Sequence, residues 1–351
     1  MNKVLIAMSG GVDSSVVALL MKEKGYDCQG ILMKLFDGDS EPACCTKKDI
    51  EDATQVANRL KIPFAVVNMA EGFRENVIDK FISAYENGAT PNPCIDCNRH
   101  MKFERLFKEG ARMGCDKVAT GHYARISYDE ESGRYILRKT LDESKDQSYV
   151  LYSLTQEQLS HAVFPLGEMT KDEARRIASD AGFINADKGD SQDICFVKNE
   201  MYYDFIERTR GKHYPEGDFV TTEGKVLGKH KGIIRYTVGQ RKGLGIAYTS
   251  PLYVIKVDCD ENNVILGSNE DLFTDTLIAK NINLISVAQI TEPMRVTAKV
   301  RYRHSAQNAT VTQIDSDTIK VVFDTPQRAI TKGQSVVLYD GDIVVGGGII
   351  Q

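Results

Sequence analysis

The hydrophobic positions in the first half of the chain alternate between two kinds of segment. Short apolar runs, which are typical of buried strands, cover residues 4–8, 29–35, 65–68 and 117–120. Segments with helical patterning cover residues 46–60, 73–88 and 102–113. Alternating strands and helices with short connections predict an α/β fold, in which helices cover a parallel sheet. In such a fold, ligands bind at the carboxyl ends of the strands.

Polar residues and glycines predict where some of the helices begin and end. Thr46 starts the run T-K-K-D, a shortened capping-box pattern, and Gly25 is placed to end the helix that follows the first strand. Residues 154–182 are also expected to be helical, with a clear cap in the run T-K-D-E that starts at Thr170.

The pattern changes from about Lys212 onwards. Glycines become dense between short β-branched runs, and after Leu277 apolar and polar residues alternate strictly. We therefore expect a catalytic α/β domain, a small β-rich central domain and a C-terminal β-barrel. Their expected bounds are 1–204, 205–276 and 277–351.

Composition and charge narrow the class of protein. At 351 residues the chain has room for two or three domains, and no apolar run approaches the ~18 residues of a membrane span. The first strand begins almost at the N-terminus, which leaves no room for a signal peptide. We therefore expect a cytoplasmic protein with no membrane partner. The net charge of −5 predicts no general affinity for nucleic acid, so such binding would need local basic patches.

The most informative motif is S-G-G-V-D-S-S, which starts at Ser9 between the first strand and the first helix. Adjacent glycines let the backbone approach an oxyanion, and free N–H groups at a helix start bind phosphate. The spacing differs from that of the Walker A and GxGxxG nucleotide loops. It instead resembles the PP-loop of ATP pyrophosphatases, which cleave ATP between the α- and β-phosphates and adenylate a substrate.

Two cysteines, Cys94 and Cys97, lie in the proline-bracketed segment 91–98. We expect its prolines and asparagines to prevent regular structure and to hold both thiols in a turn. On spacing alone, Cys-x-x-Cys fits a redox pair, half of a zinc site or ligands of a cluster. A second Cys-x-x-Cys is missing, and Cys195 lies further along in a polar segment. Eight cysteines in a reducing compartment favour chemistry or metal binding over a disulfide scaffold.

Seven motifs occur in one order along the chain. They are SGGVDSS, PNPCxxCN, ATGHYAR from Ala119, KDQSY from Lys145, DSxxICF around Cys195, YTVGQRKGLG from Tyr236 and VRYRH from Val300. Together they resemble the tRNA-specific 2-thiouridylases over the whole chain. This resemblance implies a tRNA-uridine 2-sulfurtransferase that uses ATP to thiolate the wobble uridine of tRNA at C2.

The resemblance also implies roles for particular residues of this chain. The catalytic pair would be Cys97 as nucleophile and Cys195 as the carrier of a persulfide sulfur. The residues expected to bind ATP are Ala7, Met8, Ser9, Gly10, Gly11, Val12, Asp13, Ser14, Met33 and Gly121. The residues expected to approach the target base or the tRNA are Asn92, Pro93, Cys94, His122, Lys145, Asp146, Gln147, Tyr302, Arg303 and Gln334.

The implied reaction activates uridine C2 before sulfur arrives. Transfer of AMP to the C2 oxygen makes it a good leaving group, and Mg²⁺ with the amides of the glycine turn would offset the phosphate charge. A persulfide on Cys195, loaded by a sulfur-relay protein or a cysteine desulfurase, then attacks C2, and Cys97 resolves the persulfide. Both cysteines need thiolate character, and Arg99 is a candidate for lowering the pKa of Cys97.

One position departs from the family pattern. Many relatives have an aspartate where this chain has Cys94, which weakens an acid or base role at that position. Cys94, Cys97 and Cys195 could instead hold a [4Fe–4S] cluster with one iron open to sulfide, as a second route for sulfur.

Two basic clusters are candidates for contact with tRNA phosphates. Alternation along strand 294–302 puts four cations on one face, namely Arg295, Lys299, Arg301 and Arg303. The second cluster lies in the glycine-rich middle of the chain and comprises Lys225, Lys229, His230, Lys231, Arg235, Arg241 and Lys242.

Two other functions remain open at this point. Other PP-loop enzymes add nitrogen after adenylation, and they have no use for the paired thiols of Cys97 and Cys195. A non-catalytic, metal-stapled RNA-binding protein would have no use for Asp13 and Ser14. Release of AMP that depends on tRNA distinguishes these three classes of protein.

Overall fold

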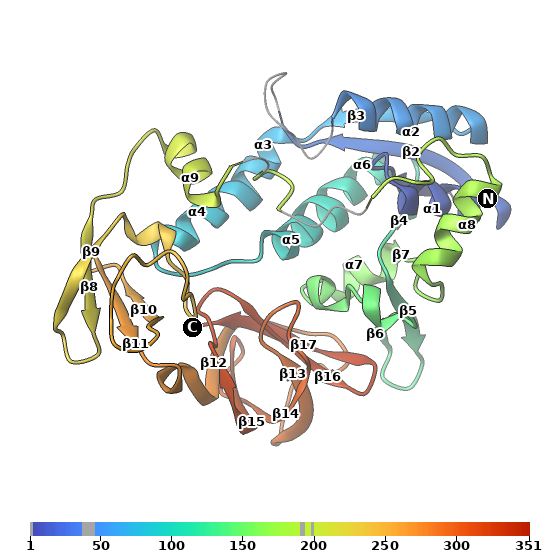
Figure 1. Cartoon of the computed structure of the whole chain (residues 1–351). Helices are drawn as coiled ribbons and strands as arrows, with labels where there is room; N and C mark the ends of the chain where they lie inside the picture. The colour runs from blue at the N-terminus through green and yellow to red at the C-terminus, as the bar shows by residue number, and fades with distance from the viewer. Residues whose placement is uncertain (1–2, 37–45, 190–193, 198–199) are drawn as a thin grey trace.

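The computed structural model describes residues 3–36, 46–189, 194–197 and 200–351. Its strands form three sheets, one in an α/β part, one in a central β part and one in a C-terminal barrel (Figure 1). None of the described helices is long and apolar enough to cross a membrane.

The α/β part is built on a five-stranded sheet with the order β3-β2-β1-β4-β7. Its strands are β1 (Lys3–Ala7), β2 (Asp27–Lys34), β3 (Phe64–Asn68), β4 (Lys117–Ala119) and β7 (Ala162–Val163). Every pairing in this sheet is parallel, so the predicted α/β class is confirmed. The central position of β1 places the turn after it between the carboxyl ends of β2 and β4.

Side chains alternate across the sheet and anchor helices on both faces. On β1, Val4 and Ile6 lie in the core of one face, while Leu5 lies in the core of the other. The first core includes residues of α1 (Val12–Glu23), α2 (Lys47–Leu60) and α8 (Lys171–Asp180). The second includes residues of α3 (Ala70–Phe73), the π-helix η1 (Arg74–Ile78), α4 (Asp79–Glu86) and α6 (Leu106–Arg112).

The predicted helix caps are confirmed. Thr46 caps α2 in a capping box with Asp49, and Thr170 caps α8 in a capping box with Glu173. In each box the threonine side chain accepts from the third helical N–H, and the carboxylate accepts from the threonine N–H.

The prediction of an irregular turn around Cys94 and Cys97 was wrong. Both lie in one continuous helical run of α5 (Pro93–Asp96), the π-helix η2 (Cys97–Arg105) and α6. The Asn92 side chain accepts a hydrogen bond from the Cys94 N–H, and Pro93 occupies the first helical position, where its missing N–H costs nothing. The proline and asparagine therefore start the helix instead of preventing it.

The prediction of one helical stretch over 154–182 was also wrong. The chain forms α7 (Gln156–His161), then the short strand β7, then α8. Pro165 and Gly167 follow β7 and interrupt the helical pattern. A side chain at position 167 would lie 2.0 Å from the Ala124 carbonyl oxygen, so the backbones meet closely there.

The central part follows α9 (Tyr202–Arg210) and contains a four-stranded sheet with the order β10-β11-β8-β9. Its strands are β8 (Gly217–Thr221), β9 (Val226–His230), β10 (Tyr253–Asp258) and β11 (Asn263–Gly267).

The C-terminal strands form a closed barrel because β12 pairs with both β15 and β17. The strands are β12 (Phe273–Leu284), β13 (Met294–Lys299), β14 (Gln307–Gln313), β15 (Thr318–Arg328), β16 (Ser335–Asp340) and β17 (Ile343–Ile350). Val296, Ala298 and Val300 are buried, as their alternation predicts.

A hairpin from the α/β part extends the barrel sheet. It consists of β5 (Ala124–Asp129) and β6 (Arg134–Lys139), and β6 pairs with β17. Arg125 and Arg138 both form ion pairs with Asp342 of the barrel. Short 3₁₀ turns complete the chain, namely η3 (Glu143–Lys145), η4 (Ser148–Leu151), η5 (Ile233–Arg235) and η6 (Glu270–Leu272).

Candidate active site

The turn between β1 and α1 has the geometry of an anion site. Gly10 has φ 73°, a left-handed conformation that glycine adopts without strain, and a Cβ there would lie 2.3 Å from the Asp49 carbonyl oxygen. Gly11 is the N-cap of α1, so the first N–H groups of this helix face the turn. A helix start of this kind binds phosphate through its N–H groups.

Hydrogen bonds hold the turn in place from within. The Ser9 N–H donates to Ser14 Oγ over 3.1 Å, and Ser14 Oγ donates to the Gly11 carbonyl over 3.1 Å. Predicted ATP residues therefore shape the turn as well as lining it.

Two distant residues, Asn185 and Lys188, hold the turn from behind, and the sequence patterns did not single them out. Both donate to the Gly10 carbonyl over 3.0 Å. Lys188 also donates to Asp49 over 2.6 Å and to Asp52 over 2.8 Å. Burial alone would lower the pKa of Lys188, but its hydrogen bonds to the two carboxylates raise it. The turn is therefore braced by a charged cluster whose members are remote in sequence.

Asp13 lies at the start of α1 and meets two groups from elsewhere. Lys171 Nζ lies 2.7 and 2.8 Å from its two carboxylate oxygens, and the Tyr123 hydroxyl donates to Oδ1 over 2.9 Å. Gly121 packs directly against this residue, since a Cβ there would lie 2.8 Å from Asp13 Cβ. A glycine is thus needed at position 121 so that the loop after β4 can approach the start of α1 closely.

The remaining predicted ATP residues lie at the same edge of the sheet. Ala7 ends β1 and Met8 follows it, Val12 begins α1, and Met33 lies near the end of the neighbouring strand β2. The structure therefore brings all ten predicted ATP residues to the carboxyl edge of β2, β1 and β4.

Cys97 and Lys102 belong to the π-helix η2, whose wider turns bring residues five apart closer to one side than an α-helix does. Burial raises the pKa of the Cys97 thiol to about 11, and the ammonium of Lys102 opposes this rise. Desolvation also raises the pKa of Cys94, which lies one turn earlier, and Lys102 again opposes it. Lys102, and not Arg99, is therefore the cation that acts on these thiols.

Lys102 also contacts His122, a buried residue of the loop after β4. The two side chains approach to 3.4 Å between Nζ and Nε2, and His122 Nδ1 lies 2.7 Å from Thr120 Oγ1. Burial and then the Lys102 charge hold the pKa of His122 well below its ordinary value of 6.5. The neutral ring accepts from Lys102 at Nε2 and donates to Thr120 at Nδ1.

The barrel brings further predicted tRNA residues to the segment before α5 and to the loop around Asp146. Gln334 Nε2 donates to the Thr90 carbonyl over 2.7 Å, close to Asn92, and the Tyr302 hydroxyl donates to the Asp146 carbonyl over 3.1 Å. The Asp146 carboxylate accepts from the N–H and the hydroxyl of Ser148, so it shapes its own loop.

Gln147 connects this loop to the nucleotide side. Its side-chain oxygen accepts from the Tyr123 N–H over 3.0 Å, and its own N–H donates to the Tyr123 carbonyl over 3.0 Å. Because the Tyr123 hydroxyl donates to Asp13, a predicted tRNA residue and a predicted ATP residue share one neighbour. Lys145 lies in η3 of the same loop, and Arg303 lies exposed after β13.

The two predicted basic clusters are partly neutralised within the protein. In the central part, Lys229 pairs with Asp218 and Arg235 pairs with Glu207. On the barrel, Arg295 pairs with Asp324. Among the described residues, the cations of these clusters for which the structure shows no acidic partner are better candidates for tRNA phosphates, namely Lys225, Lys231, Arg241, Lys242, Lys299, Arg301 and Arg303.

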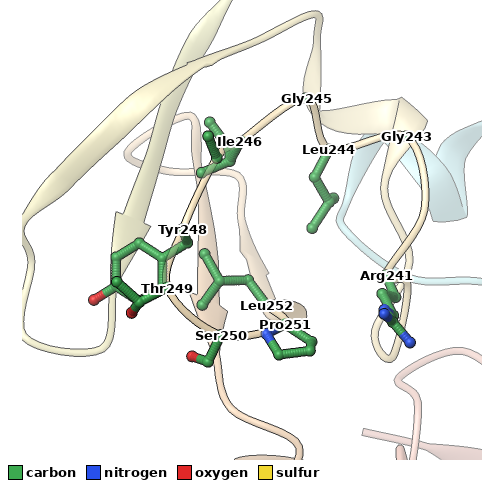
Figure 2. Close-up of a pocket in the computed structure, with 11 residues that line it drawn as sticks. Arg241, Gly243, Leu244, Gly245, Ile246, Tyr248, Thr249, Ser250, Pro251 and Leu252 are labelled. Atoms are coloured by element: carbon green, nitrogen blue, oxygen red, sulfur yellow. The ribbon is translucent and has the colours of Figure 1, made fainter.

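A cavity of ≈ 580 Å³ lies in the same central part, and Arg241 of the second cluster lines it (Figure 2). One continuous segment, from Arg241 to Leu252, lines it, with Tyr248 and Thr249 on one side and Arg241 on the other. Tyr248 is half exposed. A cavity with an exposed aromatic ring on one side and a cation on the other suits an RNA surface better than a closed small-molecule site.

Cys195 is in a disulfide, whereas Cys28, Cys94, Cys97, Cys115 and Cys259 are free thiols. Cys195 is therefore not bonded to Cys97 in this structure. Among residues 3–36, 46–189, 194–197 and 200–351, no three His, Cys, Asp or Glu side chains are grouped so that they could hold a metal ion. The ligand set proposed for a [4Fe–4S] cluster is thus not assembled here.

Family models match nearly the whole chain. A tRNA methyl transferase HUP domain matches residues 2–199, a tRNA methyl transferase PRC-barrel domain matches residues 203–268, and an aminomethyltransferase β-barrel domain matches residues 274–350. These matches agree with the α/β part, the central β part and the barrel.

Relatives of known function match the chain from end to end. A tRNA-specific 2-thiouridylase MnmA from Clostridioides difficile is 54% identical over 354 residues, covering 100% of this chain and 98% of the relative. Another from Clostridium acetobutylicum is 52% identical, covering 100% and 99%. A solved 4-thiouridine synthetase–RNA complex with bound ATP is 16% identical, with a TM-score of 0.36 over 59% of this chain and 50% of that one.

The identity to the two bacterial relatives, over their full length, settles the choice among the three classes of protein. This chain belongs to the tRNA-specific 2-thiouridylase (MnmA) family and is a tRNA-uridine 2-sulfurtransferase that uses ATP.

Proposed function

We propose that the enzyme thiolates the wobble uridine of tRNA at C2 in two steps. The two steps use the two sides of the loop that follows β4. In the first step, the uridine O2 attacks the α-phosphorus of ATP, and the bond from this phosphorus to the bridging oxygen breaks. The bonding electrons leave with pyrophosphate, and the N3 proton passes to solvent. The N–H groups at the start of α1, with Mg²⁺ on Asp13, would stabilise the phosphate charge.

In the second step, the terminal sulfur of a Cys195 persulfide attacks C2, and AMP leaves with the electrons of the C2–O bond. The Cys97 thiolate then attacks Cys195 Sγ, which breaks the S–S bond, leaves sulfur on C2 and forms a Cys97–Cys195 disulfide. A thiol reductant restores both cysteines. The disulfide now present at Cys195 would have to be reduced before this residue could accept sulfur.

Lys102 is the group we assign to the activation of Cys97. The thiol is protonated at neutral pH because its pKa is raised to about 11, and only the thiolate attacks sulfur. The Lys102 charge favours the thiolate, and the neutral ring of His122 holds Lys102 in place. We assign no step to an iron–sulfur cluster.

The partners follow from this chemistry. We propose that the tRNA contacts the loop at 145–147 and the barrel residues Tyr302, Arg303 and Gln334. A sulfur-relay protein or cysteine desulfurase would load Cys195, and we propose the cytoplasm as the compartment.

A single observation supports this proposal most strongly. The four-residue loop after β4, residues 120–123, contacts both halves of the site, because Gly121 and Tyr123 meet Asp13 while His122 meets Lys102. Lys102 belongs to the helical run of α5, η2 and α6, which we call the cysteine helix. A base held at this loop would lie between the nucleotide and the thiols.

The test uses purified enzyme with ATP, Mg²⁺, a persulfide donor and unmodified tRNA, and measures 2-thiouridine by mass spectrometry of the nucleosides. Cys97→Ser and Cys195→Ser should each reduce the product to background, whereas Cys259→Ser should retain it. Full activity of either catalytic variant would refute the assignment of that cysteine.

A further inference from the structure

Gln158 uses both ends of its side-chain amide in hydrogen bonds to two different parts of the fold. It belongs to α7, and its Oε1 accepts from the Thr155 N–H over 3.0 Å in the capping box that starts this helix. Its Nε2 donates to the Arg99 carbonyl over 2.9 Å, and 59 residues separate the two in sequence. Arg99 lies in the π-helix η2, two residues after Cys97 and three before Lys102. One side chain therefore joins the cap of α7 to the π-helical part of the cysteine helix.

The other capping boxes of the chain show that a cap alone does not require this amide. The boxes of α2 and α8 use carboxylates at the same helix position, from Asp49 and Glu173. A carboxylate closes a capping box as well as an amide does, because only an acceptor oxygen is used. Of the three capping boxes within the described residues, that of α7 alone has an amide at this position. The amide adds a donor, and this donor binds the Arg99 carbonyl.

Apolar contacts already hold α7 against the cysteine helix. Leu159 of α7 is fully buried, and it lies in the same core as Ile95 of α5 and Phe103 of η2. The hydrogen bond from Gln158 to Arg99 is therefore not needed to bring the two helices together. It is better explained by the backbone conformation of the segment that it binds.

This segment has an unusual winding. The Leu106 N–H donates to the Met101 carbonyl, five residues earlier, as in a π-helix. Turns of this kind are rare and are frequent at functional sites. In an α-helix, five residues turn the chain by about 500°, so Lys102 would project about 140° away from Cys97. The wider π turn brings Lys102 back toward Cys97.

A second amide side chain holds the same segment. Asn98 is only 2% exposed, and its Nδ2 donates to the Val150 carbonyl over 2.9 Å. Asn98 therefore ties η2 to the turn η4, while Gln158 ties η2 to α7. Both hydrogen bonds are made by residues between Cys97 and Lys102, where the winding decides how these two side chains are directed.

We infer that Gln158 is a positioning residue for sulfur transfer, whose Nε2 donor holds the π winding that places Lys102 beside Cys97. It acts through Lys102 and not on the substrate itself. Without the donor, η2 relaxes toward α-helical winding, which turns Lys102 away from Cys97 and from His122. The inference rests on the proposed role of Lys102 in the activation of Cys97.

Two variants separate the donor from the cap. Gln158→Glu keeps an acceptor for the Thr155 N–H and loses the donor, whereas Gln158→Met is uncharged and loses both. The matched control is Thr155→Ala, which removes the hydroxyl that accepts from the Gln158 N–H over 3.2 Å and leaves the amide in place. Backbone hydrogen exchange in peptides that contain residues 97–105 should be about five- to tenfold faster in both Gln158 variants. In Thr155→Ala it should stay within about twofold of the wild type.

Alkylation of Cys97 gives a second readout, which does not depend on thiolation. At pH 8, iodoacetamide should modify Cys97 about three- to tenfold more slowly in both Gln158 variants. Gln158→Met should add no further loss when it is combined with Lys102→Met, because its effect passes through Lys102. Single-turnover formation of 2-thiouridine should fall by a similar factor, and release of pyrophosphate should stay within about twofold of the wild type.

Several results would overturn the inference. One is unchanged hydrogen exchange in both Gln158 variants, and another is an equal acceleration in Thr155→Ala, which would indicate that only the cap is important. Slower alkylation in Gln158→Glu but not in Gln158→Met would indicate an effect of the added charge. A further loss in the double variant would show that the effect bypasses Lys102.

Should Gln158→Met fail to fold, hydrogen exchange in Gln158→Glu decides the question, because the added carboxylate still closes the capping box. The proposed function fails separately. Full thiolation by Cys97→Ser would refute the role of that cysteine, whereas the hydrogen-exchange comparison would still test Gln158.

Discussion

The PP-loop and the cysteine helix differ in how far each is prepared for its reaction. The PP-loop is complete without ligand, since Asn185 and Lys188 hold Gly10 from behind and Lys171 and Tyr123 hold Asp13. The cysteine helix carries a protonated thiol at Cys97. Its proposed partner, Cys195, is in another disulfide.

This difference suggests a division of labour. Phosphate binding gains from donors that are fixed beforehand, because no reorganisation is then needed during the reaction. A thiolate or persulfide that was exposed at all times would be open to oxidation. We therefore expect the nucleotide half to work alone and the thiol half to depend on reduction and on the sulfur donor.

The largest effect should come from breaking the PP-loop itself. Gly10→Ala combines a left-handed backbone with a Cβ 2.3 Å from the Asp49 carbonyl oxygen. We expect a loss of about 2 kcal/mol or more in the free energy of unfolding and no release of pyrophosphate. The control is Gly25→Ala, where φ is 80° but no atom lies within 4 Å of the new Cβ. It should cost about 1 kcal/mol and keep activity, and a normal rate in Gly10→Ala would contradict the account.

The next effect concerns the charged cluster of Lys188, Asp49 and Asp52, which supports the PP-loop and which we call the brace. Lys188→Met leaves Asp49 and Asp52 without their cation, and Asp52 is only 6% exposed. We expect a loss of about 2 kcal/mol in unfolding by urea, against less than about 1 kcal/mol for Lys229→Met, which breaks an exposed pair with Asp218. Similar losses in both variants would show that the brace is unimportant.

The same brace has a predicted pH dependence. Burial would raise the pKa of Asp49, but its hydrogen bonds to Lys188 and Thr46 lower it below the ordinary 3.8. The carboxylate therefore stabilises the fold at pH above 3.8, and this contribution is lost as the pH falls through the lowered pKa. The stability difference between wild type and Lys188→Met should shrink over that range.

A smaller effect should be measurable at the thiol. Iodoacetamide should modify Cys97 about ten times faster for each unit of pH, up to its pKa of about 11, because only the thiolate reacts. Lys102→Met removes the cation that opposes the raised pKa and should slow modification at pH 8 by about three- to tenfold. Peptide mass spectrometry separates Cys97 from Cys94. Lys108→Met, which removes an exposed partner of Glu104 on α6, serves as control, and equal rates in both variants would refute the role of Lys102.

Much of the fold could be predicted from local patterns. The strands of the parallel sheet, the caps at Thr46 and Thr170 and the alternation on β13 depend on neighbouring residues, and all are present. The helix that carries Cys97 was missed because Asn92 and Pro93 were interpreted as turn residues, although the same pair also starts helices.

The candidate site could be predicted only in part. The turn from Ser9 to Ser14 has a local signature, whereas Lys171, Asn185 and Lys188 reach it from far along the chain, and no spacing indicates them. Arg99 is nearer to Cys97 in sequence than Lys102, but the π-helix turns Lys102 toward the thiol. The parts of the site that the motifs do not predict are therefore set by contacts between residues far apart in the sequence and by the winding of the π-helix.

The most direct test of the division between the two halves is the amount of pyrophosphate released by a Cys97→Ser/Cys195→Ser double variant. With γ-labelled ATP and excess unmodified tRNA, the account predicts release of about one equivalent per active site, at a rate near that of the wild type, with no 2-thiouridine. Absence of pyrophosphate release from a folded double variant would contradict it, because adenylation would then require the thiols.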